Sequence, residues 1–419
     1  MKKTWQMVGR LAIAVVMLFL TACAADVPEE PTVESEEAVE LPTTEPTDEP
    51  TAPSETEPEE EIAPTMTPSG PGPWPLEMRS PEYGMQAFLW WRPEVASRDL
   101  QAIRDAGFTW AKVNFGWRDI EGAGKGAFDW SRTDHIVEMA NAENIDLLIR
   151  VDHQPEWAGG GYPLNGPPDD LQDLADFFYA LASRYRGRIR AYEVWNEPNL
   201  SREWGGRVPS PEEYVELLRV SYAAVKEADP DAMVISAGLS PTGSWDDTAR
   251  PDDWYLDAMY QAMDGSSDGY FDVLGAHGPG YISPPERDPS EVAANPAYGG
   301  HRAFCFRRVE DLRNIMVQYG DEDKQVALLE FGWTSDPRPD SPYHWHAVDE
   351  ETKADYLVRA YEYARENWSP WIGLMTVIYI ADHDWTPEDE QYWWAITDPG
   401  WPELKTRPAY NALKAMPKE

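Results

Sequence analysis

Residues 191–200 read Ala-Tyr-Glu-Val-Trp-Asn-Glu-Pro-Asn-Leu, an apolar strand pattern that runs into an amide, an acid and a proline. Pro198 has no backbone N–H to give to a sheet, so we expect it to stop the strand. The carboxamide of Asn196 and the carboxyl group of Glu197 are then left at the rim of the sheet. The segment therefore predicts a buried strand that presents an acid and an amide at its end.

A second segment, residues 325–333, repeats this arrangement. It reads Gln-Val-Ala-Leu-Leu-Glu-Phe-Gly-Trp, an apolar run that leads to Glu330 and then to a glycine. Two glutamates at the ends of two buried strands predict a paired-carboxylate site. Glycoside hydrolysis needs such a pair, because one carboxyl group protonates the leaving oxygen while the other attacks the sugar or activates water.

Strand-like runs alternate with helix-like segments over residues 76–419. Eight such runs occur, at residues 85–90, 110–115, 146–151, 190–194, 233–238, 273–277, 325–329 and 374–379. The segments between them are amphipathic, with apolar residues every three or four positions. This alternation predicts a parallel sheet, and eight units predict an α/β fold of the (β/α)8 TIM barrel type in a single catalytic domain. A doubly wound open sheet is the alternative. In a barrel the active site lies on the loops that follow the strands, where both glutamates fall.

The residues around the two glutamates resemble those of the retaining glycoside hydrolases of clan A, in the branches of families 39 and 5. The resemblance rests on Trp-Asn-Glu-Pro-Asn at 195–199 and Leu-Glu-Phe-Gly-Trp at 329–333, and it covers roughly residues 85–416. It implies that Glu197 is the acid/base and Glu330 the nucleophile of a retaining β-glycosidase. It also implies double displacement, with Asn196 on the 2-hydroxyl of the sugar. These roles require a protonated Glu197 and an ionised Glu330 near neutral pH.

Other polar residues are expected at the same rim. His153 follows the third strand and His277 ends the sixth, so each is a candidate for binding a sugar hydroxyl or orienting a glutamate, with a structural histidine as the alternative. Tyr281 follows His277 at a longer spacing than the aromatic hydroxyl of clan members, and its role stays open. Where many relatives carry arginine in strand two, this chain has Lys112. The positive charge that lowers the pKa of the nucleophile therefore comes from Lys112 or from Arg150.

Tryptophan is the remaining signal, with 20 in the chain. An indole ring stacks on the C–H face of a sugar while its N–H donates to a hydroxyl. Trp333 and the cluster of Trp385, Trp393 and Trp394 follow predicted strands and are candidates for sugar contact, with core packing as the alternative. The acidic run at residues 381–390 lacks the spacing of an EF-hand loop, so we expect neither a metal nor a cofactor.

The first 22 residues are expected to be a lipoprotein signal peptide. Two lysines precede an apolar stretch that is too short to span a bilayer. The ending Leu-Thr-Ala-Cys resembles the bacterial lipobox, which implies a lipid on Cys23; ordinary cleavage nearby is the alternative. Residues 23–75 hold fifteen acidic residues and no lysine or arginine, which predicts a disordered acidic tether. We therefore expect an extracytoplasmic protein that is lipid-anchored to the bacterial cell envelope.

The net charge of −40 bears on the partners. A negative surface repels polyanions and no basic stripe is visible, so nucleic acid is not expected. The expected substrate is a neutral poly- or oligosaccharide, the membrane is reached only through the lipid on Cys23, and the protein is expected to be a monomer. Two other functions stay open. A transglycosylase would lengthen its products with the same residues, and a catalytically silent glycan-binding envelope lipoprotein would turn nothing over.

Overall fold

The structure, a computed structural model, describes residues 75–90, 92–159 and 165–418. The chain divides into two units, Met1–Met66 and Thr67–Glu419, and the whole of the first unit lies outside the described residues. The signal peptide, Cys23 and nearly all of the acidic tether lie there too, so they stay predictions. Within the described residues no helix combines the length and apolar character that a membrane span requires.

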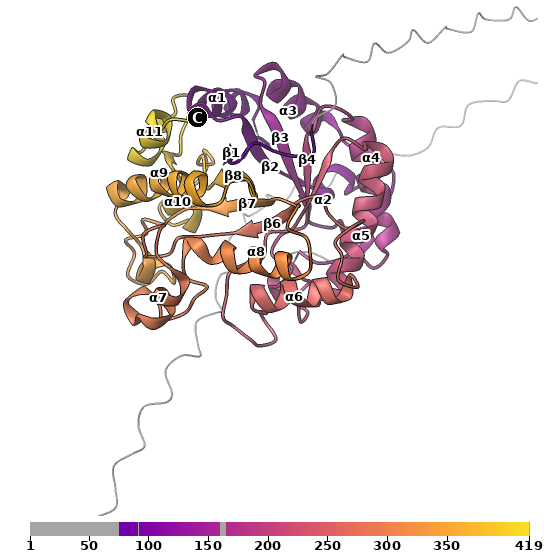
Figure 1. The fold of residues 1–419 in the computed structure, drawn as a ribbon. Helices are drawn as coiled ribbons and strands as arrows, with labels where there is room; N and C mark the ends of the chain where they lie inside the picture. The colour runs from indigo at the N-terminus through magenta and orange to yellow at the C-terminus, as the bar shows by residue number, and fades with distance from the viewer. Residues whose placement is uncertain (1–74, 91, 160–164, 419) are drawn as a thin grey trace, which may run out of the picture. The chain divides into compact units, whose positions relative to one another are not determined.

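Eight parallel strands form the centre of the second unit (Figure 1). They are β1 (Glu82–Gln86), β2 (Trp110–Gly116), β3 (Asp146–Asp152), β4 (Ala191–Val194), β5 (Met233–Ser236), β6 (Leu274–His277), β7 (Val326–Phe331) and β8 (Ile372–Val377). Their order in the sheet is β5-β4-β3-β2-β1-β8-β7-β6. Parallel bridges from Ile235 to Val273 and from Leu239 to Ala276 join β5 to β6, so the sheet closes almost completely. This confirms the predicted (β/α)8 barrel.

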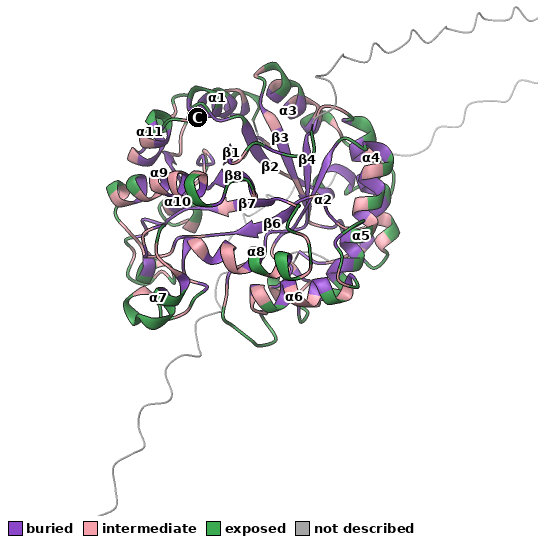
Figure 2. Cartoon of the chain, viewed as in Figure 1, coloured by how far each residue is buried: buried purple, intermediate pink, exposed green. Residues whose placement is uncertain are grey.

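Helices surround the strands. The principal ones in the described part are α1 (Pro93–Asp105), α3 (Ser131–Ala142), α4 (Leu171–Arg184), α5 (Pro211–Ala228), α6 (Asp252–Ala262), α8 (Val309–Gln318), α9 (Glu350–Asn367) and α11 (Pro408–Ala415). Side-chain caps fix several of the helix starts: Asp170 accepts from the N–H of Gln172 before α4, and Ser210 accepts from the N–H of Glu213 before α5. The strands are buried, whereas the helices alternate between buried and exposed residues (Figure 2), as amphipathic helices around a barrel must.

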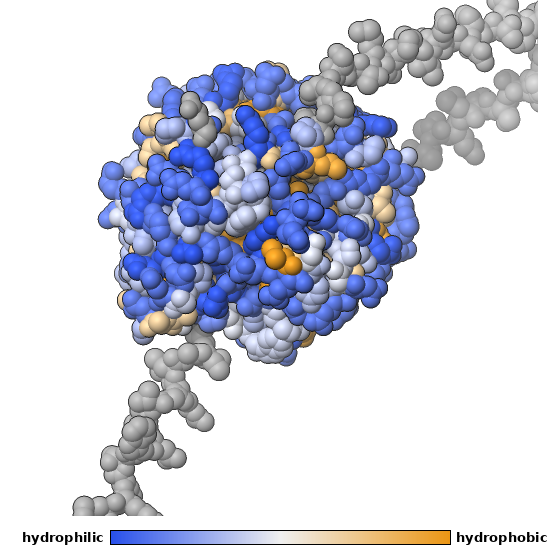
Figure 3. Space-filling model, viewed as in Figure 1, coloured by the Kyte–Doolittle hydropathy of each residue, from blue (hydrophilic) through white to orange (hydrophobic). Residues whose placement is uncertain are grey.

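Shorter elements interrupt the loops. They are α2 (Trp117–Glu121), α7 (Pro289–Ala294), α10 (Glu390–Trp394) and the antiparallel pair β9 (Thr397–Asp398) and β10 (Lys405–Thr406). Of these, α10 follows β8 and reaches the site described below. The face of the molecule seen in Figure 3 is mostly hydrophilic, in keeping with the charge of the chain.

The predicted starts of the first and last strands lie a few residues after the observed ones. The sequence predicted the first at residues 85–90 and the last at 374–379, whereas β1 starts at Glu82 and β8 at Ile372. A glutamate is polar and therefore favours a loop over a buried strand. The buried carboxylate of Glu82, however, accepts a hydrogen bond from Trp110 Nε1 at 2.5 Å and forms an ion pair with Arg190 at 3.0 Å. These partners allow an acid to open a buried strand.

Candidate active site

A cavity of about 1050 Å³ lies where the strands of the barrel end. Pockets for drug-sized ligands span roughly 300–1,000 Å³, so this one has room for more than a single sugar unit. Both glutamates singled out by the sequence line it. The lining also includes Arg150, Asn196, Arg202, His277, Tyr281, Tyr343, Trp345, Trp385, Glu390 and Trp394.

The two glutamates meet at one imidazole. Nδ1 of His277 lies 3.0 Å from Oε1 of Glu197 and 4.0 Å from Oε2 of Glu330. These carboxylate oxygens therefore lie no farther apart than the sum of the two distances. Inverting glycosidases separate their carboxyl groups by roughly 6.5–9.5 Å, so even the upper bound reaches only the lower end of that range. Both side chains are largely buried, at 12% exposure for Glu197 and 16% for Glu330.

The chain bends sharply to bring Glu197 to His277. Strand β4 ends at Val194, where the predicted run also ends, and both Trp195 (φ 76°) and Glu197 (φ 38°) lie in the left-handed region. Such conformations are costly for residues with side chains and are concentrated at functional sites. Gly238 makes room for the imidazole, because a Cβ at this position would lie 2.1 Å from Cδ2 of His277.

Two cations hold Glu330. The Lys112 ammonium lies 3.1 Å from Oε1 of Glu330, and Nη1 of Arg150 lies 3.2 Å from the same oxygen. The sequence left these two residues as alternatives, and the structure brings both of them to the glutamate. Burial raises the pKa of Glu330, but the charges of Lys112, His277 and Arg150 outweigh burial and leave the pKa below its usual value. Glu330 is therefore ionised at neutral pH.

Each cation is held from behind by another acid. Glu193 on β4 is fully buried, and its Oε2 lies 3.0 Å from the Lys112 ammonium. Asp152 at the end of β3 lies 3.1 Å from Nε of Arg150 and accepts from Asn114 Nδ2 at 2.7 Å. Opposite charges on both sides of each cation offset the cost of burying it. The position of Glu330 is thus set by side chains that come from three strands.

Glu197 has a cation of its own, which the sequence did not reveal. Nη2 of Arg202 lies 2.7 Å from Oε2 of Glu197, and the arginine side chain is 62% exposed. Burial raises the pKa of Glu197, but the hydrogen bond with His277 and the charge of Arg202 outweigh burial and bring the pKa below its usual value. This differs from the expectation that Glu197 stays protonated, because the hydrogen bond with His277 and the charge of Arg202 together reverse the effect of burial.

Asn196 and Tyr281 also reach the cavity, whereas His153 does not line it. The Asn196 carbonyl accepts from Nη1 of Arg150 at 3.2 Å. The Tyr281 hydroxyl donates to the carbonyl of Pro241 at 3.1 Å, and its ring packs on Phe304, so it builds the cavity wall. His153 instead pairs through Nδ1 with Asp152.

The tryptophans divide between the cavity and the core. Trp385 and Trp394 line the cavity, and Trp385 packs edge-on against Phe88 with ring centroids 4.8 Å apart. Trp333 was a candidate for sugar contact, but its side chain is fully buried and its Nε1 donates to the carbonyl of Ser283. Trp393 lies outside the cavity lining, with its Nε1 directed to the carbonyl of Pro387. Adjacent tryptophans on one short helix point in different directions, which loop sequence alone does not reveal.

Several cavity residues escaped the sequence interpretation. No sequence motif singles out Arg202, Tyr343 or Glu390. They come from the loops after β4, β7 and β8, and only the fold brings these loops together. Trp345, between His344 and His346, was not among the tryptophans predicted to contact sugar. Its ring lies beside Tyr281, with centroids 5.9 Å apart, and is 45% exposed. An exposed tryptophan in a cavity wall is a suitable surface for stacking a sugar.

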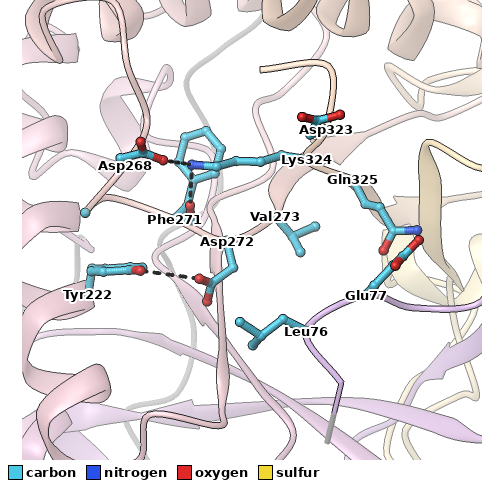
Figure 4. Close-up of a pocket in the computed structure, with 11 residues that line it drawn as sticks. Leu76, Glu77, Tyr222, Asp268, Phe271, Asp272, Val273, Asp323, Lys324 and Gln325 are labelled. Carbon is cyan, nitrogen blue, oxygen red and sulfur yellow. Dashed lines mark hydrogen bonds and ion pairs between the residues drawn. The ribbon is translucent and has the colours of Figure 1, made fainter. Parts of the chain in front are cut away.

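Two other features lie outside this site. His383 pairs with Asp382 through Nδ1 at 3.1 Å and with Asp384 through Nε2 at 3.0 Å, so each ring nitrogen has its own carboxylate. A smaller cavity of about 280 Å³ lies at the opposite end of the barrel, just before β6 and β7 (Figure 4). Its lysine, Lys324, is already bonded to Asp268 and to the Phe271 carbonyl. Neither feature shares the paired glutamates.

Sequence comparison finds similarity to glycoside hydrolases. The model of the cellulases of glycosyl hydrolase family 5 matches residues 77–266, less than half of the chain, with Glu197 inside the match and Glu330 outside it. A β-xylosidase from Geobacillus stearothermophilus is 31% identical over 130 residues, which make up 28% of this chain and 25% of that enzyme. The match therefore spans about a quarter of the length of this curated relative.

Solved structures share the barrel. A family 39 glycoside hydrolase from Bacteroides cellulosilyticus WH2 has a TM-score of 0.55 at 18% identity, covering 81% of this chain and 64% of that one. A GH5_18 structure from Streptomyces cattleya in complex with GlcNAc has a TM-score of 0.57 at 16% identity, covering 81% of this chain and 80% of that one. At these identities the structures show the fold alone, and the two sequence matches are to glycoside hydrolases over part of the chain.

Proposed function

We propose that this chain is a retaining O-glycosyl hydrolase that cleaves β-glycosidic bonds of neutral poly- or oligosaccharides. One observation carries the proposal: Glu197 and Glu330 both face Nδ1 of His277 in the wall of a cavity that has room for several sugar units. Retention needs carboxyl groups about 5–5.5 Å apart, which the bound set by His277 allows. The family 5 match and the β-xylosidase match support the same chemistry.

The reaction is a double displacement. The Glu330 carboxylate attacks the anomeric carbon and forms a glycosyl ester while the bond to the leaving oxygen breaks and the Glu197 proton passes to that oxygen. Water then gives a proton to Glu197 and attacks the anomeric carbon, which frees Glu330. Lys112 and Arg150 keep Glu330 ionised for the first step. Asn196 accepts from Arg150 through its carbonyl, so its amide group remains to donate to the 2-hydroxyl of the sugar.

The arginine at Glu197 sets a condition on this mechanism. Glu197 has to hold a proton when the glycosidic bond breaks, yet Arg202 favours the ionised form. Because most of the Arg202 side chain is exposed, a sugar in the leaving-group position can move it aside and exclude water. Either change raises the pKa of Glu197 towards the value that a general acid needs.

Turnover of a panel of aryl β-glycosides and neutral polysaccharides tests the function. Proton NMR of the first product should show the β-anomer, and product lengths should shorten. An α-anomer as the first product would refute retention, and lengthened products would indicate a transglycosylase. Glu197→Gln and Glu330→Gln serve as controls, because each keeps the shape of the side chain and removes its charge.

We also propose that the enzyme works outside the cytoplasm, held to the cell envelope by a lipid on Cys23. The support is the signal-like amino terminus and its Leu-Thr-Ala-Cys ending. Labelling of growing cells with radioactive palmitate should mark the wild type and leave Cys23→Ser unlabelled. Equal labelling of the two proteins would contradict the proposal.

A further inference from the structure

Two exposed tryptophans lie beside the cavity without lining it. Trp245, in the loop between β5 and α6, is 58% exposed, and Trp254 on α6 is 37% exposed. Their ring centroids are 4.6 Å apart, and the Arg250 guanidinium lies 5.4 Å from the centroid of the Trp245 ring. These neighbours hold the Trp245 ring in place while more than half of its surface stays open. A pair of exposed indoles is a costly surface feature for a soluble domain unless something binds there.

The loop that carries Trp245 is tied to the chain that follows Glu197. Nδ2 of Asn199 donates to the carbonyls of Ser240 and Arg250, both at 2.9 Å. The N–H of Ser201 also donates to the carbonyl of Thr248 at 2.8 Å. The loop residues just before Trp245, up to Ser244, line the cavity. The tryptophan pair therefore continues the cavity wall on the side of Glu197.

This position identifies which part of a substrate would reach the tryptophans. Glu197 protonates the leaving oxygen in the proposed mechanism, so the leaving-group half of the substrate lies on its side of the cavity. An indole binds the C–H face of a pyranose by stacking, and the serine and threonine of the loop offer hydroxyls to the same chain. Asp246 and Asp247, both exposed, would repel an anionic sugar.

We propose that Trp245 and Trp254 form a distal binding site for a neutral sugar unit in the leaving-group part of a β-linked glycan chain. The inference rests on the proposed glycosidase function and adds a substrate class to it, namely chains that extend well past the scissile bond. Short substrates end inside the cavity and gain nothing from this site, whereas longer chains gain one stacking contact. The preference for length therefore comes from the surface outside the catalytic cavity.

The test is a comparison of kcat/KM across chain lengths with the full chain. Wild type and Trp245→Ala are assayed on aryl β-glucoside and β-xyloside and on cello- and xylo-oligosaccharides of two to six units. We expect the variant to lose roughly tenfold on the six-unit chain and to stay within about twofold of the wild type on the aryl glycosides, which is the scale of one stacking contact. Trp401→Ala is the matched control, because Trp401 is 47% exposed and also lies under an arginine, Arg98.

A binding measurement separates this inference from the catalytic proposal. Calorimetry with cellohexaose or xylohexaose on the Glu330→Ala variant should give roughly tenfold weaker affinity when Trp245→Ala is added. If the wild type cleaves none of the substrates, the proposed function fails, while the binding comparison still tests the tryptophan pair by itself. An equal loss at every chain length, or no loss at any, overturns the inference. So does a wild-type dimer that Trp245→Ala dissociates without any length-dependent loss, because the surface then serves self-association.

Discussion

Replacing Arg202 with alanine should move the basic limb of the pH profile upward. Nη2 of Arg202 lies 2.7 Å from Oε2 of Glu197. His277 also contacts Glu197, but it lies near Glu330 as well, so Arg202 is the better residue for changing Glu197 alone. Removing a cation destabilises the neighbouring carboxylate, so the pKa of Glu197 rises. The protonated form that donates to the leaving oxygen then persists to higher pH. We therefore expect Arg202→Ala to gain relative activity on the alkaline side of the optimum.

The size of the shift follows from the exposure of the pair. Two unit charges about 4 Å apart attract each other by about 4 kcal/mol at an effective dielectric constant of 20 and by about 1 kcal/mol in water. Arg202 is 62% exposed, so its interaction with Glu197 lies nearer the value in water. An interaction of about 1.4 kcal/mol corresponds to about one pKa unit. The basic limb should therefore rise by about one pH unit, and by less at high salt.

The assay measures kcat/KM against pH, because this ratio reports the pKa values of the free enzyme. An oligosaccharide is the substrate, since its leaving group needs the proton. Arg207→Ala is the matched control: Arg207 is 51% exposed in the same loop region but pairs with Glu213 instead. A basic limb that stays in place, or that falls, would show that Arg202 does not set the protonation of Glu197.

Three further outcomes are expected. Glu197→Ala should slow a substrate with a poor leaving group far more than an activated aryl glycoside, and azide should rescue it, whereas Glu330→Ala should lose both substrates; an equal loss without azide rescue refutes the assigned roles. Glu193→Gln should let the Lys112 charge act more fully on Glu330, which lowers the pKa of Glu330 and moves the acidic limb of kcat/KM to lower pH. An acidic limb that moves to higher pH would contradict this effect of Glu193 on Lys112 and Glu330. Trp333→Ala should cost roughly 3–5 kcal/mol of unfolding free energy in urea, because it empties a buried site; a change in KM alone would place Trp333 at the sugar instead.

Much of the fold could be predicted because its signals are local. Parallel strands buried on both faces read as apolar runs, and the helices between them carry apolar residues at helical spacing. The order of eight such units leaves few topologies besides a barrel. The start of β1 was missed because a paired, buried Glu82 has the same letter as an exposed glutamate in a loop.

The candidate site also has a part that the sequence predicted and a part that only the tertiary structure decided. Sequence alone determined that Glu197 follows the fourth strand and that Glu330 lies at the end of the seventh, because each acid comes at the end of its own apolar run. Which side chains surround the two glutamates was decided only by tertiary structure. Arg202 contacts Glu197 because the chain makes a left-handed turn that the residue types do not predict. Trp333 is buried in the core although it comes directly after the strand that carries Glu330. The first outcome depends on the backbone turn between two residues five positions apart, and the second on packing against residues distant in the chain, such as Phe306 and Tyr356. Neither kind of contact leaves a periodic pattern in the sequence.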